Sequence, residues 1–143
     1  MKRFIFLILS LAMASSLYAA PQTEIIGSYY KTPEQKAMEC YGRGVRAKKK
    51  ADAETDPAKR AKLYMKAKEE FSKAVGYQAH YDGYLALGQV YIALGQNESG
   101  FDACSHAQAY KPASEEAKSC MTEAKEKMEL AANAGQGGGD GSN

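Results

Sequence analysis

Small residues recur at intervals of three and four between residues 37 and 51. They are Ala37, Cys40, Gly44, Ala47 and Ala51. This spacing puts all five on one face of an α-helix. A helix face without large side chains excludes water only if another helix approaches it closely. The chain is therefore predicted to contain at least one tightly packed pair of helices.

Further segments show the same helical spacing, and capping or breaking residues bound each of them. The expected helices start at Thr32-Pro33 and Asp56-Pro57, and then cover about residues 82–94, 99–110 and 114–135. The apolar row of the last one is Ala117, Met121, Ala124, Met128 and Ala131. Thr and Asp cap helices and proline suits the first helical position. No segment alternates with the period of two that a half-buried strand requires, so we predict an all-α fold of antiparallel helix hairpins.

The N-terminus has the pattern of a cleavable secretory signal peptide. Lys2 and Arg3 precede an apolar run from Phe4 to Leu11, and small residues lead to Ala19. A retained membrane anchor is the alternative, although the apolar run is shorter than a bilayer span. No cysteine stands near the cleavage site, which argues against a lipoprotein. The predicted organisation is a signal peptide over 1–19, an extended lead-in over 20–32, a helical domain over 33–132 and a flexible glycine-rich tail over 133–143.

The segment from Tyr84 to Pro112 resembles one tetratricopeptide repeat, a helix–turn–helix unit. The matching positions are Tyr84, Leu87-Gly88, Tyr91, Gly95, Ala107 and Pro112. Gly88 falls where the paired helix comes closest, and Gly95 falls in the turn between the helices. The preceding hairpin, with Ala67, Phe71 and Ala74, resembles a divergent repeat with longer helices. The last helix resembles the capping helix of such arrays, and the resemblance covers about residues 33–132.

This resemblance implies a short solenoid of about two repeats plus a cap, whose first helices line a concave groove. Tetratricopeptide proteins bind peptides or partner proteins in that groove. The corresponding positions in the second repeat are Asp82, Leu85, Gln89, Ile92 and Ala93. In the first repeat they are Met38, Tyr41, Val45, Lys48 and Lys49. The resemblance therefore predicts a mixed apolar and basic groove, the alternative being that Leu85 and Ile92 pack against a neighbouring helix.

Three cysteines in an exported chain suggest a disulfide. Cys104 lies eight residues before Pro112 and Cys120 eight residues after it. If Pro112 marks the turn between antiparallel helices, the two cysteines face each other, so we predict a Cys104–Cys120 bridge. Cys40 is then left over, either as a small buried residue or as the site of an intermolecular bond.

Charge is distributed unevenly along the chain. Basic residues outnumber acidic ones 13 to 7 between residues 31 and 73, whereas acidic residues outnumber basic ones 9 to 4 between 74 and 143. Arg43, Arg46 and Lys50 share one side of the first helix and form a basic patch. This patch could bind an anionic envelope surface, or it could be a solvated face. Nucleic acid is not an expected partner outside the cytoplasm.

The sequence contains no catalytic, metal-binding or cofactor-binding pattern. His80 and His106 have no second ligand at metal spacing, and no nucleophile elbow, phosphate loop or dinucleotide fingerprint occurs. We therefore expect no enzyme and no cofactor. The expected function is that of an adaptor or scaffold in the cell envelope, in the bacterial periplasm. The alternatives are a structural protein that self-associates through its uneven charge, and a binder of anionic envelope surfaces.

Overall fold

The structure, a computed structural model, describes residues 30–136. Residues 1–29 and 137–143 are outside this range, so the predicted signal peptide and most of the predicted lead-in and tail lie outside the described residues. The helices belong to one compact unit, which begins at Thr32.

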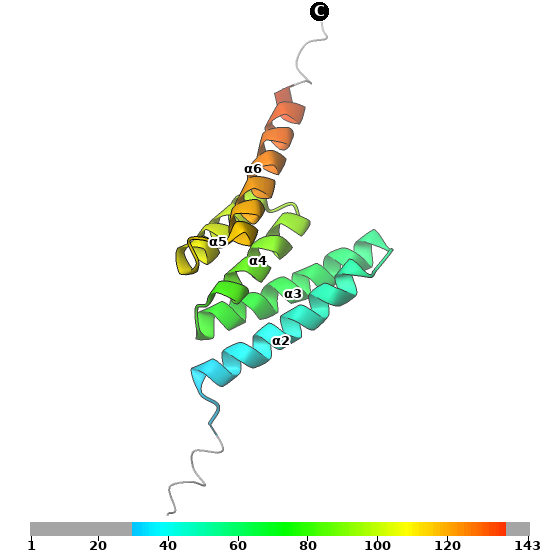
Figure 1. The fold of residues 1–143 in the computed structure, drawn as a ribbon. Coiled ribbons are helices and arrows are strands. Elements are labelled where there is room, and N and C mark those ends of the chain that lie inside the picture. Colours follow the sequence, from blue (N-terminus) through cyan, green and yellow to red (C-terminus); the bar gives the residue numbers. More distant parts are fainter. Residues whose placement is uncertain (1–29, 137–143) are drawn as a thin grey trace, which may run out of the picture. The chain divides into compact units, whose positions relative to one another are not determined.

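Five helices make up the described part of the chain, and it contains no strand. They are α2 (Pro33–Asp52), α3 (Pro57–Tyr77), α4 (Tyr81–Ala93), α5 (Asn97–Tyr110) and α6 (Glu115–Gln136). Each helix packs against the next one along the chain, and α4 also contacts α2 and α6 (Figure 1). The predicted all-α stack of helix hairpins is thereby confirmed, with α2, α4 and α6 forming one row of neighbours.

The first two helices begin at the predicted caps. The side chain of Thr32 accepts the backbone N–H of Gln35 at 3.2 Å, and the Gln35 side chain accepts the Thr32 N–H at 3.0 Å. Asp56 accepts the backbone N–H of Ala58 at 2.8 Å. Each cap satisfies amide groups that have no partner inside the helix, which fixes where the helix starts.

The row of small residues on α2 meets α3 as predicted. All five, from Ala37 to Ala51, are buried. A Cβ atom added to Gly44 would lie 2.7 Å from ring carbons of Phe71, which is itself fully buried. Because Gly44 has no side chain, the Phe71 ring can lie directly against the backbone of α2.

Helices α4 and α5 also approach each other through glycines. A Cβ at Gly88 would overlap the Sγ of Cys104, and a Cβ at Gly100 would lie 2.6 Å from Cγ1 of Ile92. Gly95, in the turn that follows α4, has φ of +74°, a conformation that favours glycine. The predicted roles of Gly88 as a close contact and of Gly95 as a turn residue are confirmed.

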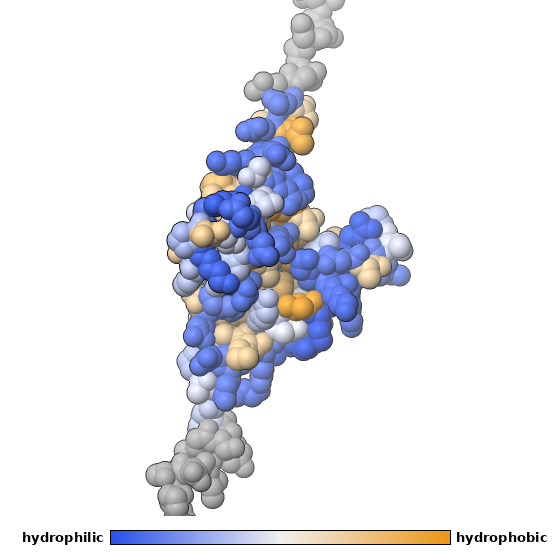
Figure 2. Space-filling model, in the orientation of Figure 1, coloured by the Kyte–Doolittle hydropathy of each residue, from blue (hydrophilic) through white to orange (hydrophobic). Residues whose placement is uncertain are grey.

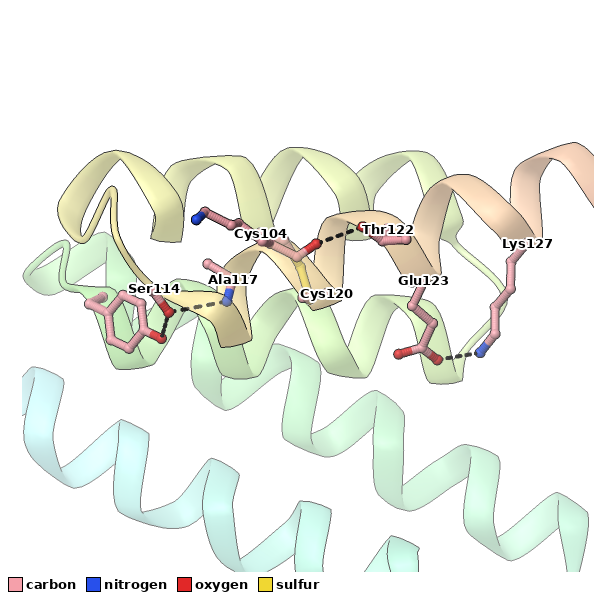
Figure 3. Close-up of a disulfide and its surroundings, with 9 residues drawn as sticks. Cys104, Ser114, Ala117, Cys120, Thr122, Glu123 and Lys127 are labelled. Carbon is pink, nitrogen blue, oxygen red and sulfur yellow. Dashed lines mark hydrogen bonds and ion pairs between the residues drawn. A yellow bond between two sulfur atoms is a disulfide. The ribbon is translucent and has the colours of Figure 1, made fainter.

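A disulfide joins Cys104 of α5 to Cys120 of α6, with 5.9 Å between their Cα atoms (Figure 3). Both cysteines are buried beside Ile92 and Ala124. The predicted pairing is confirmed, and the bond is of the kind found in oxidising, exported environments. Cys40 is free and buried, as one of its two predicted interpretations required.

The helices differ in length, and two segments project from the stack: the end of the α2–α3 hairpin and the C-terminal part of α6 (Figure 1). Helices α2 and α3 have 20 and 21 residues, whereas α4 and α5 have 13 and 14. Helix α6 has 22 residues and is about 33 Å long, against about 21 Å for α5. It continues past the predicted boundary at Ala132. Ala131, predicted to face inward, is exposed because α5 is too short to cover it.

Candidate functional site

The first part of the candidate site is the side of α2 that carries Met38, Tyr41, Val45 and Lys48. Their spacing of three and four places them on one side of the helix. Met38 is 69% exposed and Val45 is 41% exposed, although both are apolar. Neighbouring apolar side chains left in water are characteristic of interaction surfaces. Lys49, the remaining predicted position on α2, is also exposed.

Tyr41 joins this side of α2 to the start of α4. Its ring centroid lies 5.6 Å from those of Phe71 and His80, and the side chain is half-buried. Burial, and secondarily the negative charge of Asp82, raise the pKa of the Tyr41 phenol. The structure therefore brings two predicted groove residues, Tyr41 and Asp82, close together although they come from different repeats.

Lys48 is held by an ion pair at the far end of α2. Its ammonium group lies 3.0 Å from the carboxylate of Asp52, which also accepts a hydrogen bond from the Tyr64 hydroxyl at 2.7 Å. Burial raises the pKa of Asp52, but the hydrogen bonds from Tyr64 and Lys48 outweigh it, and the net pKa is lowered. Lys48 thus has a fixed position, whereas Lys49 makes no ion pair within residues 30–136.

Helix α4 exposes only part of the predicted set of groove residues. Asp82, Gln89 and Ala93 are exposed, as a groove requires. Ile92 is only 4% exposed and Leu85 is half-buried. The prediction that Ile92 lines the groove is wrong, because α6 and the disulfide cover it. Ala86 lies between Asp82 and Gln89 in the same helical row, but it is half-buried and packs against the core cluster that contains Phe71.

Helix α6 adds an acidic margin that the sequence analysis did not assign to the site. A depression of about 400 Å³ lies between α4 and α6. It is lined by Gln89, Glu115, Glu116, Ser119, Cys120 and Glu123. Because α4 contacts both α2 and α6, we refer to the side formed by these three helices as the α2–α4–α6 face. It is basic and apolar on α2, polar on α4 and acidic on α6.

Tyr81 fixes the start of α6 against α4. Its hydroxyl lies 2.6 Å from that of Ser114 and donates to the Glu116 carboxylate at 2.9 Å. The ammonium group of Lys111 lies 4.0 Å from the centre of the Tyr81 ring. The Ser114 hydroxyl lowers the pKa of Tyr81, but burial and Glu116 raise it, and the net pKa is raised. These contacts hold Glu116 at the acidic margin of the face.

The predicted basic patch lies on another side of α2. Arg43, Arg46 and Lys50 line a cleft of about 270 Å³ between α2 and α3, together with Lys66. The patch and the predicted groove residues are therefore two separate surfaces, which the helical spacing on α2 already distinguishes. Lys66 was not predicted to belong to the patch, because its position depends on how α3 packs against α2.

No protein-family model, curated protein or solved structure matches this chain. Within residues 30–136, no group of three or more His, Cys, Asp or Glu side chains is placed to hold a metal ion. No helix of that same range is long and apolar enough to cross a membrane. The α2–α4–α6 face offers apolar contact, hydrogen-bonding groups and charges of both signs, which are the means by which proteins bind other proteins.

Proposed function

We propose that this chain is an exported, tetratricopeptide-like adaptor that binds a segment of another protein across the α2–α4–α6 face. The repeat pattern of residues 84–112 and the stacked hairpins support the tetratricopeptide assignment. The disulfide and the signal-like N-terminus support export, and we place the protein in the bacterial periplasm. The proposal involves no catalytic step.

The exposure of Met38 and Val45 beside the half-buried Tyr41 is the observation on which this proposal depends. The small-residue face of α2, on another side of the helix, is fully buried, so Met38 and Val45 are not left in water for want of a core. A partner that covers them gains apolar contact of roughly 25 cal/mol per Å² removed from water.

The charges of the face define the chemistry of the partner. Lys49, which forms no ion pair within residues 30–136, lies on α2 beside Lys48, which is paired with Asp52, whereas Glu116 and Glu123 lie on α6. A segment that crosses from α2 to α6 is therefore expected to carry acidic residues at one end, apolar residues next to them and basic residues at the other end. Complementary charges of this kind fix the direction in which a segment binds.

Site-specific photo-crosslinking in the native cell envelope tests the proposal. A photoreactive residue would replace Val45 on α2 or Gln89 on α4, and in a control Ala109, which is exposed on α5. We expect the same partner to be crosslinked from Val45 and from Gln89, and not from Ala109.

A pair of methionines provides matched substitutions. Met38 on the face and Met65 on α3 are both exposed, at 69% and 49%. Met38→Glu should abolish the crosslink from Gln89, whereas Met65→Glu should leave it unchanged. A crosslink that persists in Met38→Glu, or one that is equally strong from Ala109, would contradict binding at this face.

A further inference from the structure

The projecting end of α6, residues 126–134, has an unusual surface for a helix that has no neighbour. We call it the α6 tip. Leu130 in this segment is 68% exposed, and Glu126 and Glu129 beside it are also exposed. Neither carboxylate forms a salt bridge within the described residues. Lys127, the one cation of residues 126–134, pairs with Glu123 outside the tip at 2.8 Å, so the tip has a net negative charge. The space-filling view shows hydrophobic residues among hydrophilic ones on this projecting part of α6 (Figure 2).

The cleft between α2 and α3 has the complementary properties, and we call it the basic cleft. Its lining consists of Arg43, Arg46, Ala47, Lys50, Leu63 and Lys66. Arg43 is paired with Glu70 at 2.6 Å. The other three cations form no salt bridge in residues 30–136, and they surround the apolar side chains of Ala47 and Leu63. The cleft therefore combines unpaired positive charge with an apolar floor.

The α6 tip does not occupy the basic cleft of its own chain. Helix α6 contacts α4 and α5, but neither α2 nor α3. The tip and the cleft thus belong to opposite ends of the stack of helices. An acidic tip and a basic cleft at opposite ends of one stack are complementary between two copies of the chain.

We propose that the α6 tip of one copy binds in the basic cleft of a second copy. Leu130 covers Ala47 and Leu63, while Glu126 and Glu129 pair with the cations that line the cleft. Each copy in such a contact keeps one unoccupied cleft and one unoccupied tip. The contact is therefore heterologous, and repetition of it gives open head-to-tail chains instead of a closed dimer.

This inference does not rest on the proposed adaptor function, because neither the tip nor the cleft contains Met38 or Val45. Sedimentation velocity of the full chain over a range of concentrations is the first test. We expect a continuous series of species that grows with concentration. Raising the salt from about 0.1 M to about 1 M shortens the Debye length from about 10 Å to about 3 Å, and should weaken association about tenfold or more.

Complementary charge reversal is the decisive test. One variant, Arg46→Glu/Lys50→Glu/Lys66→Glu, has an acidic cleft and an acidic tip. The other, Glu126→Lys/Glu129→Lys, has a basic cleft and a basic tip. Each variant alone should be monomeric where the wild type associates. An equimolar mixture should associate again. The acidic tip of the first variant fits the basic cleft of the second, and the basic tip of the second fits the acidic cleft of the first.

Two controls separate the contact from general effects of charge. Glu98→Lys/Asp102→Lys makes the same change of net charge as the tip variant, but on the exposed surface of α5, and should associate like the wild type. Leu130→Ser changes no charge and should weaken association about tenfold. Circular dichroism and thermal unfolding should show that every variant is folded. A wild type that stays monomeric at low salt, or a mixture that fails to associate, would overturn the proposal.

Discussion

Replacing Gly88 with alanine tests the close contact between α4 and α5. The added Cβ would overlap the Sγ of Cys104 and would lie 3.1 Å from the carbonyl oxygen of Gly100. It would also lie 3.2 Å from the backbone nitrogen of Cys104. Two of these three neighbours are backbone atoms of α5, and the third belongs to the disulfide that ties α5 to α6. None of them is the free end of a flexible side chain, so relief requires α4 and α5 to move apart.

Two effects of opposite sign determine the result. Alanine favours a helix interior over glycine by about 1 kcal/mol. Overpacking a core costs about 1–3 kcal/mol, and the upper half of that range applies where backbone has to move. We therefore expect Gly88→Ala to lower the free energy of unfolding by about 1–2 kcal/mol. That corresponds to a fall in Tm of roughly 5–10 °C for a domain of this size.

Gly42 provides the matched control, since it also lies inside a helix. A Cβ there would meet only the Nη1 atom of Arg46, at 3.7 Å, which is ordinary van der Waals contact. Gly42→Ala should therefore stabilise the protein by about 1 kcal/mol through helix propensity. Urea unfolding followed by circular dichroism measures both variants. If Gly88→Ala is as stable as Gly42→Ala, the reasoning is refuted, because a side chain at position 88 would then not force α4 and α5 apart.

A double-mutant cycle separates the sulfur from the backbone. In a Cys104→Ala/Cys120→Ala background the overlapping Sγ atom is absent, while the carbonyl oxygen of Gly100 remains. The cost of Gly88→Ala should be smaller in that background, because part of the overlap has been removed. An unchanged cost would show that the sulfur plays no part in it.

Other perturbations probe the core, the disulfide and the acid stability. Cys104→Ala/Cys120→Ala should lower the free energy of unfolding by about 3 kcal/mol, as expected for a loop of this size, and urea unfolding without reductant would show it. Phe71→Ala should cost about 3–5 kcal/mol in the same assay, because the ring is fully buried against Gly44. A smaller loss would mean that α2 and α3 close over the cavity. The lowered pKa of Asp52 adds stability above the unfolded-state pKa of about 3.9, and this is lost as the pH falls through the folded-state pKa. Tyr64→Phe should therefore reduce the loss of stability between pH 6 and pH 2, and a loss equal to that of the wild type would contradict this assignment.

The sequence alone determined the helices and most of their inward faces. Thr32 and Asp56 indicate where helices start because capping depends on neighbours within one turn. The row from Ala37 to Ala51 indicates the buried side of α2 because helical periodicity is local. The disulfide followed from the equal sequence separations of its two cysteines from Pro112. A turn between antiparallel helices places residues at equal separations opposite each other. Each of these inferences uses residues that are close in sequence.

Tertiary packing decided which surfaces are open. Ile92 has the helical phase of a groove residue, yet α6 covers it, and no local pattern states where α6 lies. Lys66 joins Arg46 and Lys50 only because α3 packs against α2 in one register. Leu130 is exposed because α6 is longer than α5. The sequence of α6 alone does not show this, since it depends on the length of the helix that packs beside it. Burial and surface charge depend on which helix lies alongside, so only the packed structure determines them.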